Sequence, residues 1–510
     1  MRFFRRRYTV RSIALGIAAL FTASSLLAQD VSSFEKKITV KTLSNGLTVI
    51  VMERPEAPVF SFFTMVDAGS AQDPKGETGL AHMFEHMAFK GTPEIGTTNW
   101  PAEKIALQRE EAAYQALDRE RQKRVNADPK KVAQLENAFE AAKAAAQKYV
   151  KVNEFGQLIE ENGGVGLNAF TSDDETGYFY SLPANRVELW ALLESSRYKH
   201  PVFREFYKER DVVVEERRMR TDSNPVGRLV EQFLAAAYTA HPYGTPTVGW
   251  PSDITGVTMT EANKFYGVYY VPANMTIAIV GDVKAATLIP MIERYFGGIP
   301  AAPKPEDLRT IEPAQRGERT VTITEQTQPF YLEGYHRPDY RDPDDAVYDA
   351  ISDILSEGRT SRLYRSLVRD KKIAAAAAGF SPFPGTKYPS LFAFFGVPTP
   401  GHTPQEIADA THAEIDRLRN EDVSDAELQM VKTRAKANLI RGLDNNEGLA
   451  QQLATYQARY GDWRELFRQI DKIDKVTKAD IRRVANKTFV PSNLTVAEIV
   501  NAKAAAKGAK

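Results

Sequence analysis

The sequence contains no cysteine among its 510 residues. Disulfide bonds, thiolate zinc sites, cysteine nucleophiles and a lipid anchor on an N-terminal cysteine are therefore all excluded. Any bound metal must be held by histidine and carboxylate side chains. Histidine is also scarce, with seven in the whole chain, so two histidines in one short motif are informative.

The chain also lacks an excess of charge of either sign. Its 66 basic and 66 acidic residues give a formal net charge of zero. Proteins that bind nucleic acid carry a basic surface, so no nucleic-acid partner is expected. With 43% hydrophobic and 26% charged residues the composition is that of a globular protein, and the length favours two to four domains.

Long apolar runs are confined to the N-terminus. A basic stretch through Arg11 precedes an apolar run at residues 13–21 and then small residues, which is the pattern of a secretory signal peptide at 1–28. Cleavage after Ser25 is an alternative to cleavage after Ala28, and an uncleaved N-terminal anchor is an alternative to both. No other run approaches a membrane span of about 20 residues. We therefore expect a bacterial protein exported to the periplasm.

Two parts of the chain repeat each other. The segment "VTMTEANKFYGVYYVPANMTIAIVGDV" from Val257 resembles "VTKADIRRVANKTFVPSNLTVAEIV" from Val476, and Asn274 matches Asn493 at the same offset of 219. Each copy is typical of an amphipathic helix, a Pro-Xaa-Asn turn and a β strand. A constant offset without gaps favours an internal duplication over the chance recurrence of a common unit.

The starts of the two copies align at a larger offset. "GLAHMFEHMAFKG" corresponds to "AVYDAISDILSEG", with Gly91 opposite Gly358 at an offset of 267. The difference between the offsets predicts an insertion of about 48 residues in the first copy. Residues 103–153 are rich in Ala, Glu, Lys, Gln and Arg, and Asp128-Pro129 interrupts them, so we expect a projecting hairpin of two helices. It is either a lid or docking arm, or a solvated helical pair without function.

Each copy opens with alternating strands, continues with helices and closes with a strand. This order predicts an α+β fold of two homologous domains, each a mixed or antiparallel sheet backed by helices. The expected boundaries are 36–296 for the first domain and 319–500 for the second. A proline-rich linker at 297–318 joins them, and a flexible tail follows at 501–510.

The stretch "GLAHMFEHMAFKGT" at residues 79–92 holds two of the histidines. His82 and His86 are one helical turn apart, so both imidazoles project from one face, and Glu85 lies beside them. Thr78 is expected to cap the start of this helix. The stretch is an inverted His-Xaa-Xaa-Glu-His zinc motif, with a coincidental helix face as the alternative. A catalytic zinc with two histidines usually takes a carboxylate as its third ligand.

Candidates for this third ligand cluster in "REFYKERDVVVEERRMRTDSNP". Glu209 and Glu216 are seven residues apart and share one helix face, whereas Glu215 points elsewhere. For an isolated glutamate in so charged a helix, a solvated side chain is the simpler interpretation. The residues alone therefore leave the third ligand open.

Together these motifs resemble the pitrilysin/insulinase family of inverzincin zinc metallopeptidases, and above all its half-length bacterial branch, which is similar to mitochondrial processing peptidase. The resemblance covers nearly the whole mature chain and includes "NAFTSDDETGYFYSLP" and "HPYGTPTVGWPSDI". It implies that one Zn²⁺ per chain is bound by His82, His86 and Glu216. Glu85 would then activate the attacking water, and Glu209 would orient a ligand histidine.

Two counts agree on Glu216 as the ligand. The family places its third ligand about 75 residues after the histidine motif. Here the separation is longer by about the length of the insertion that the repeat offsets predict. The resemblance therefore favours Glu216 over Glu215.

The resemblance also implies how a peptide is held. Asn168, Ala169 and Phe170 match the family's edge strand, on which a substrate pairs through its backbone, although an internal strand without substrate contact is the alternative. The family's second half contributes an Arg and a Tyr seven residues apart, which stabilise the oxyanion. Arg369 fits the arginine as a substrate-binding residue, but Ala376 stands in the place of the tyrosine.

We therefore expect a zinc metalloendopeptidase that cleaves short or unfolded peptides in the cell envelope. A related metal-free subunit would supply the missing Arg/Tyr pair in a heterodimer, and a homodimer with another donor is the alternative. The alternative function is that of a non-catalytic or specific precursor-processing subunit of a heterodimeric peptidase.

Overall fold

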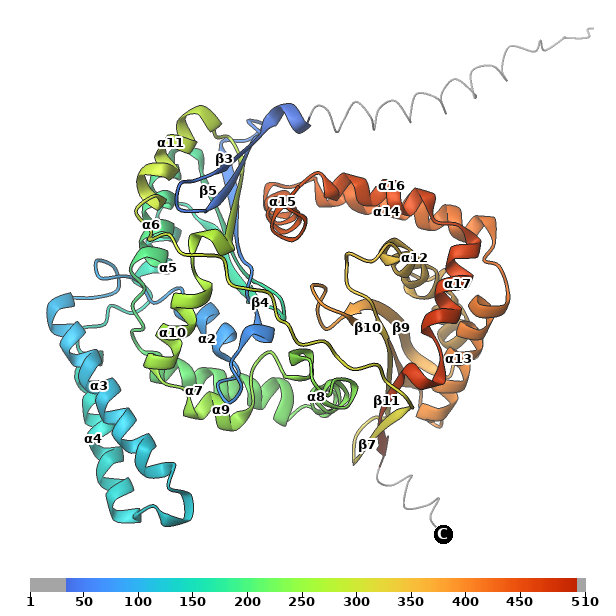
Figure 1. Ribbon diagram of the computed structural model, residues 1–510, viewed down its shortest axis with the longest axis horizontal. Helices are drawn as coiled ribbons and strands as arrows, with labels where there is room; N and C mark the ends of the chain where they lie inside the picture. Colours follow the sequence, from blue (N-terminus) through green and yellow to red (C-terminus); the bar gives the residue numbers. More distant parts are fainter. Residues whose placement is uncertain (1–33, 502–510) are drawn as a thin grey trace, which may run out of the picture.

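A computed structural model of the chain describes residues 34–501. The expected signal peptide at 1–28 lies outside these residues, as does the expected C-terminal tail apart from Asn501. Within the described part, no helix is long and apolar enough to cross a membrane. The chain forms two halves, each built on one β sheet (Figure 1).

The first half is built on a six-stranded sheet in the order β1-β2-β6-β3-β5-β4. Its strands are β1 (Ile38–Thr42), β2 (Thr48–Glu53), β3 (Val59–Val66), β4 (Val165–Thr171), β5 (Thr176–Pro183) and β6 (Met275–Gly281). β2 and β6 run parallel, and the other neighbours run antiparallel. β4 is therefore an edge strand of a mixed sheet.

Helices α6 and α11 cover one face of this sheet. Phe62 of β3 and Phe296 of α11 both pack against Trp190 of α6, which is fully buried. The helices of the first half are α2 (Leu80–Met87), α3 (Trp100–Arg121), α4 (Pro129–Gln147), α5 (Glu154–Glu161), α6 (Val187–Lys199), α7 (Phe206–Arg217), α8 (Pro225–Ala237), α9 (Pro251–Gly256), α10 (Met259–Tyr269) and α11 (Ala285–Phe296).

The second half is built on a five-stranded sheet in the order β7-β11-β8-β10-β9. Its strands are β7 (Arg319–Glu325), β8 (Phe330–Arg337), β9 (Ala374–Phe383), β10 (Ser390–Pro398) and β11 (Leu494–Asn501). Its helices are α12 (Asp345–Ser356), α13 (Pro404–Asn420), α14 (Asp425–Gly442), α15 (Asn446–Tyr460), α16 (Glu465–Lys475) and α17 (Lys478–Thr488). β7 and β11 run parallel, as β2 and β6 do, so the two sheets share one strand order with β1 added in the first.

The repeated sequence segments fold in the same way. A helix, a 3₁₀ turn and a strand follow one another as α10 and β6 in the first half and as α17 and β11 in the second. Each helix begins with a capping box, formed by Thr258 with Glu261 and by Thr477 with Asp480. The expected α+β fold of two homologous halves is confirmed.

Each half also packs one of its helices on the sheet of the other half. α15 packs on the first sheet, where Leu453 shares a core with Phe63. α8 packs on the second sheet, where Phe233 shares a core with Leu332. Each sheet therefore has one face covered by its own half and one by the opposite half. The repeat boundaries at 296 and 319 do not separate two independent cores.

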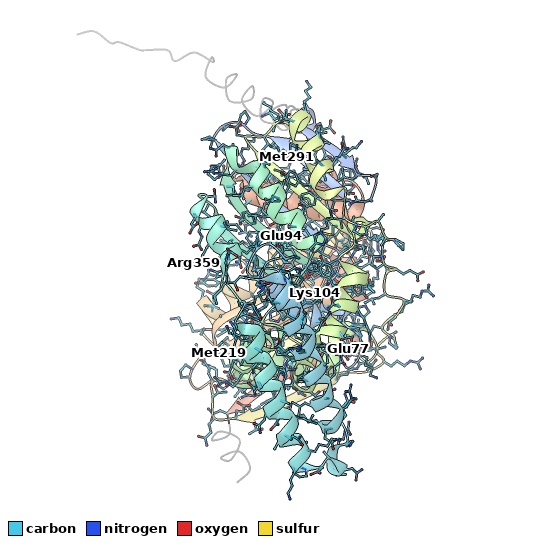
Figure 2. All side chains as sticks on the ribbon, turned by 90° about the vertical axis from the view of Figure 1, so that its left-hand side faces the viewer. Glu77, Glu94, Lys104, Met219, Met291 and Arg359 are labelled. Atoms are coloured by element: carbon cyan, nitrogen blue, oxygen red, sulfur yellow. The ribbon has the colours of Figure 1, made fainter. Side chains whose placement is uncertain are left out.

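The insertion forms a hairpin of α3 and α4 that projects from the first half (Figure 1). Asn99 caps α3, and Asp128 caps α4 with Pro129 in its first turn. Figure 2 looks onto these two helices, whose outer ends extend into solvent. The hairpin expected between residues 103 and 153 is confirmed.

Candidate metal centre

Helix α2 carries the histidine motif and begins in a backbone conformation that favours glycine. Gly79 has a φ of 94° at the helix start. The amides of Gly79 and Ala81 donate hydrogen bonds of 2.7 and 2.9 Å to the carboxylate of Asp73. The expected cap at Thr78 is wrong, because its hydroxyl donates to Asp253 instead.

His82, Glu85 and His86 lie together on one face of α2. One potential ligand atom from each lies within 4.8 Å of the others, and the two imidazole centroids are 4.9 Å apart. His82 is buried, whereas Glu85 and His86 are partly exposed. Across residues 34–501 this is the only group of three His, Asp or Glu side chains whose ligand atoms lie that close together.

Helix α7 brings Glu216 to both histidines. Oε1 of Glu216 lies 3.6 Å from Nε2 of His82, and its Oε2 lies 3.3 Å from Nε2 of His86. Oε1 of Glu216 also pairs with Arg220 at 2.8 Å. Glu215 is exposed and pairs with Arg218 at 2.8 Å, and no contact joins it to either histidine. Of these two glutamates, Glu216 is the one placed to share an ion with the histidines.

The arrangement fits a zinc ion. Ligand atoms that lie about 2.0–2.1 Å from a tetrahedral zinc stand roughly 3.3 Å from one another. The distances from the Glu216 carboxylate to the two imidazole nitrogens, 3.6 and 3.3 Å, are close to this value. Burial and the neighbouring His86 lower the pKa of His82 to about 4, which keeps its imidazole neutral. Burial has the same effect on His86, but contacts with Glu209 and Glu216 outweigh it and raise the pKa of His86 to about 9, so a metal would displace the proton on its Nε2.

Glu209 holds His86 from its other side. Nδ1 of His86 lies 2.9 Å from Oε1 of Glu209, and Oε2 of Glu209 lies 2.5 Å from the ammonium group of Lys90. Burial opposes ionisation, yet the contacts with His86 and Lys90 lower the pKa of Glu209 to about 2. An ionised carboxylate at Nδ1 fixes the proton there and leaves Nε2 to face the metal position. Nδ1 of His82 is buried without a hydrogen-bond partner in the described chain.

A cavity of ≈ 430 Å³ opens beside the motif. Its lining includes Glu85 and His86 from α2, Asn168 and Ala169 from β4, and Phe89. Burial raises the pKa of Glu85, so its carboxyl group retains a proton more readily than a solvated glutamate does. The cavity thus connects a group able to transfer protons with the edge of the first sheet.

Strand β4 borders this cavity with its outer edge. Ala169 pairs with Tyr178 of β5 on one side, and no described strand pairs on the other. Asn168 and Ala169 line the cavity. The ring of Phe170 packs against Phe63, in the core between the sheet and α15. Asn168 and Ala169 therefore face the site, whereas Phe170 presents only its backbone at the edge.

Arg369 lies apart from these residues. It is exposed on the second half, and its guanidinium pairs with Asp370 at 2.6 Å. Ala376 lies in β9, the edge strand of the second sheet. Neither Arg369 nor Ala376 is among the described residues that line the cavity beside Glu85. The structure therefore does not bring the predicted substrate-binding arginine to the metal centre.

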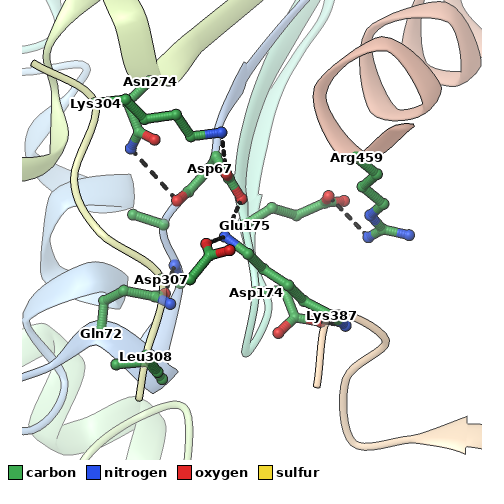
Figure 3. A network of polar contacts seen from close by, with 12 residues as sticks. Asp67, Gln72, Asp174, Glu175, Asn274, Lys304, Asp307, Leu308, Lys387 and Arg459 are labelled. Carbon is green, nitrogen blue, oxygen red and sulfur yellow. Dashed lines mark hydrogen bonds and ion pairs between the residues drawn. The ribbon is translucent and has the colours of Figure 1, made fainter. Parts of the chain in front are cut away.

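Polar contacts that the sequence did not reveal tie the turn after β4 to the second half (Figure 3). Asp174 accepts a hydrogen bond of 2.9 Å from the amide of Lys387, whose ammonium group lies 2.9 Å from Asp67. Glu175 pairs with Arg459 of α15 at 2.9 Å. In the sequence, only the adjacent acidic residues of "TSDDET" indicate these contacts, because Lys387 and Arg459 lie 213 and 284 residues away from their partners.

Comparison with known proteins identifies the family. Residues 48–122 and 140–250 match the model for insulinase (peptidase family M16), and residues 256–435 match the model for the M16 inactive domain. The chain belongs to peptidase family M16. Residues 123–139, which interrupt the first match, lie within the hairpin, as expected for an insertion.

Relatives of this M16 protein cover almost its whole length. The zinc protease PqqE of Helicobacter pylori is 28% identical over 506 residues, covering 96% of this chain and 98% of PqqE. The probable mitochondrial-processing peptidase subunit beta of Arabidopsis thaliana is 23% identical, covering 90% of this chain and 78% of that subunit. The likeness to these two relatives therefore extends over at least 90% of this chain.

Solved structures share the fold of this M16 protein. A protease from Helicobacter pylori matches with a TM-score of 0.76 at 26% identity, over 91% of this chain and 99% of that one. The periplasmic protease PqqL of Escherichia coli matches with a TM-score of 0.68 at 19% identity, over 92% of this chain and 48% of PqqL. At this identity the likeness to PqqL shows the fold alone.

Proposed function

We propose that this protein is a zinc-dependent endopeptidase that hydrolyses short or unfolded peptides in the cell envelope. The observation that carries the proposal is the convergence of His82, His86 and Glu216, in which both Nε2 atoms face one carboxylate at 3.6 and 3.3 Å. The names of M16 relatives as zinc proteases support the activity. The expected signal peptide supports the location.

The residues of the site have distinct tasks in this reaction. His82, His86 and Glu216 would hold one zinc ion, which when bound lowers the pKa of a water molecule and polarises a carbonyl group. Glu85 takes the proton of the attacking water and delivers it to the leaving amine. Its pKa, raised by burial, suits the second of these transfers. Glu209 keeps the proton of His86 on Nδ1.

An extended peptide is the form of substrate that suits the site. β4 carries an outer edge without a described partner strand, and Asn168 and Ala169 connect this edge to the cavity at Glu85. A peptide added there as a further strand would bind through its backbone, with limited preference for sequence. Folded proteins rarely offer a free strand, so short or unfolded peptides are favoured.

A metal-free homologous subunit would complete the active site in a heterodimer. Ala376 stands where the family resemblance places an oxyanion-binding tyrosine, and loss of one such donor costs about 100- to 1000-fold in rate. A relative named as subunit beta of a processing peptidase supports a subunit role. A homodimer with another donor is the alternative assembly. A non-catalytic or precursor-processing subunit is the alternative function, favoured by the absence of a tyrosine at residue 376.

The first test uses the mature chain alone, loaded with zinc and freed of excess metal. Zinc near one per chain is expected, together with hydrolysis of a quenched peptide mixture that is slow without the partner subunit and that Glu85→Gln abolishes. Glu216→Gln should lose the metal, whereas Glu215→Gln, its exposed neighbour, should retain it. Equal zinc contents in these two variants would refute the ligand set. Zinc binding with negligible hydrolysis would support the heterodimer, and ordinary enzymatic rates would refute an obligate one.

A further inference from the structure

The helical hairpin, of which residues 123–139 interrupt the family match, has no part in the chemistry above. We infer that the base of this hairpin clamps the metal centre, with Glu103 and Arg204 as positioning residues for His86. The inference rests on the proposed function, because it concerns the same metal ligands. It concerns the base of the hairpin and not its exposed tip.

Arg204 is the centre of this clamp. Its side chain is 1% exposed, and its guanidinium forms a bidentate pair with Glu103 at 2.6 and 3.0 Å. It also donates hydrogen bonds to the backbone oxygens of Lys90, Thr92 and Ile95, in the loop that follows α2. One side chain therefore joins the hairpin, the loop after the histidine motif and the segment that leads into α7.

The chemistry of this pair favours positioning over simple attachment. Glu103 is fully buried in the first turn of α3. A buried ion pair is costly to desolvate, and apolar side chains of similar volume stabilise a fold at least as well. A guanidinium with five donors, however, can bind a carboxylate and several backbone oxygens in fixed directions at once. Apolar side chains cannot hold those oxygens in place.

The loop that Arg204 binds leads to a metal ligand. Lys90 accepts a hydrogen bond from Arg204 on its backbone oxygen and extends its ammonium group to within 2.5 Å of Oε2 of Glu209. Oε1 of Glu209 lies 2.9 Å from Nδ1 of His86. A displacement of the Lys90 backbone would withdraw its ammonium group and loosen the carboxylate that orients His86.

The hairpin also packs against the back of α7. Tyr114 of α3 and Phe139 of α4 contact Tyr207, with ring centroids 4.3 and 5.1 Å away. Arg210 lies over the ring of Tyr114, 4.5 Å from its centroid. Tyr207 and Arg210 are three residues apart and share one face of α7, while Glu216 faces the histidines. The hairpin thus supports the helix that carries the third ligand from behind.

An exposed ion pair between the two helices of the hairpin supplies a matched control. Val125, in the turn between α3 and α4, is 96% exposed. Arg121 and Glu136 form an ion pair of 2.5 Å, and both side chains are about half exposed. Exposed pairs of this kind contribute little to stability. Glu136→Gln therefore makes the same chemical change as Glu103→Gln, on the same hairpin, without touching the buried base.

The experiment compares these two variants in the full zinc-loaded chain. Glu103→Gln is expected to release zinc to a chelator at least about ten-fold faster than the unchanged protein. It should also alter the visible absorption spectrum of the cobalt(II)-substituted chain, which reports ligand geometry independently of activity. Glu136→Gln should match the unchanged protein in both. Equal zinc release and equal spectra for the two variants would overturn the inference.

A second variant separates positioning from stability. Arg204→Met combined with Glu103→Leu replaces the ion pair by apolar side chains, so that no unpaired charge is left buried. The loop oxygens lose their donors, so the thermal unfolding midpoint is expected to fall. Zinc release should stay fast and the cobalt spectrum altered at temperatures well below this midpoint, where the variant is folded. Normal zinc release in this double variant would overturn the inference, and the double variant decides alone if Glu103→Gln does not fold. Failure of the unchanged protein to bind zinc would instead refute the proposed function, and this inference with it.

Discussion

Nδ1 of His86 lies 2.9 Å from Oε1 of Glu209. This carboxylate would not bind the metal itself but contacts a residue that would. Lys90 balances the charge of Glu209 from the other side at 2.5 Å. A carboxylate in this position fixes the tautomer of a metal-binding histidine and raises its basicity. The metal centre thus depends on residues outside the histidine motif.

Substitution of Glu209 tests this dependence. Glu209→Gln removes the charge behind His86 and is expected to weaken zinc binding about 10- to 100-fold. Competition with a chromophoric chelator measures the affinity. Asp211→Asn, on the exposed face of the same helix, should bind zinc as the unchanged protein does. An affinity unchanged by Glu209→Gln would show that His86 needs no such support.

The contacts of Asp174 predict a loss of stability and of substrate affinity together. Its carboxylate, 3% exposed, accepts hydrogen bonds from the hydroxyl of Tyr243 at 2.5 Å and from the amide of Lys387 at 2.9 Å. Asp174→Ala leaves these donors buried and unpaired, so the free energy of unfolding should fall by about 3 kcal/mol. KM for peptides should rise, because the turn after β4 loosens. Urea titration and steady-state kinetics measure the two effects, and the exposed Glu306→Ala is the control.

Helix α15 of the second half packs on the first sheet. A core substitution in this helix is therefore expected to affect the first half. Leu453 of α15 is fully buried against that sheet. Leu453→Ala should lower the free energy of unfolding by about 2–5 kcal/mol and speed amide hydrogen exchange in β3 and β6. Gln451→Ala, exposed on the same helix, should change neither. Faster exchange confined to the second half would contradict the packing described.

The free energy of unfolding at acidic pH depends on the protonation of Glu427. Burial opposes its ionisation, yet contacts with Arg362 and Ser424 lower its pKa from 4.5 to about 2. A carboxyl group whose pKa falls on folding stabilises the folded state above its unfolded pKa and loses that contribution as the pH drops toward its folded pKa. The difference in unfolding free energy between the unchanged protein and Glu427→Gln should therefore be constant from about pH 7 to pH 5 and shrink below about pH 4.5.

Urea titrations over this range measure that difference. Glu421→Gln removes an exposed carboxylate nearby in the sequence and should leave the profile unchanged. A difference that grows as the pH falls would contradict the assigned direction of the pKa shift.

Features that depend on spacing along the chain could be predicted from the sequence. The four-residue interval between His82 and His86 placed both imidazoles on one helix face, because the helical period relates sequence to geometry directly. The constant repeat offset predicts two homologous domains, and the difference between offsets predicts the size of the insertion, which the composition of residues 103–153 locates. The choice of Glu216 over Glu215 rests on the family resemblance together with the predicted length of the insertion.

Features that depend on contacts between distant segments could not be predicted. An amphipathic helix reveals its apolar face but not the sheet on which it will pack. The packing of α8 and α15 on the sheets of the opposite halves therefore cannot be predicted from the sequence. The cap at Asp73 lies outside the usual N-cap spacing, which pointed to Thr78. Arg369 is predicted from the family resemblance, and a sequence match does not show that its guanidinium pairs with Asp370 at the surface.

Because α8 packs on the second sheet and α15 packs on the first, the linker is not what holds the two halves together. A nick anywhere between residues 297 and 318 would leave two fragments, each with a helix embedded in the sheet of the other. Such a nicked chain should elute from gel filtration as one particle until denaturant separates it. A gene for the metal-binding half alone would leave one face of its sheet bare to water. The duplicated halves therefore form a single folding unit, and truncation between them is expected to unfold both halves.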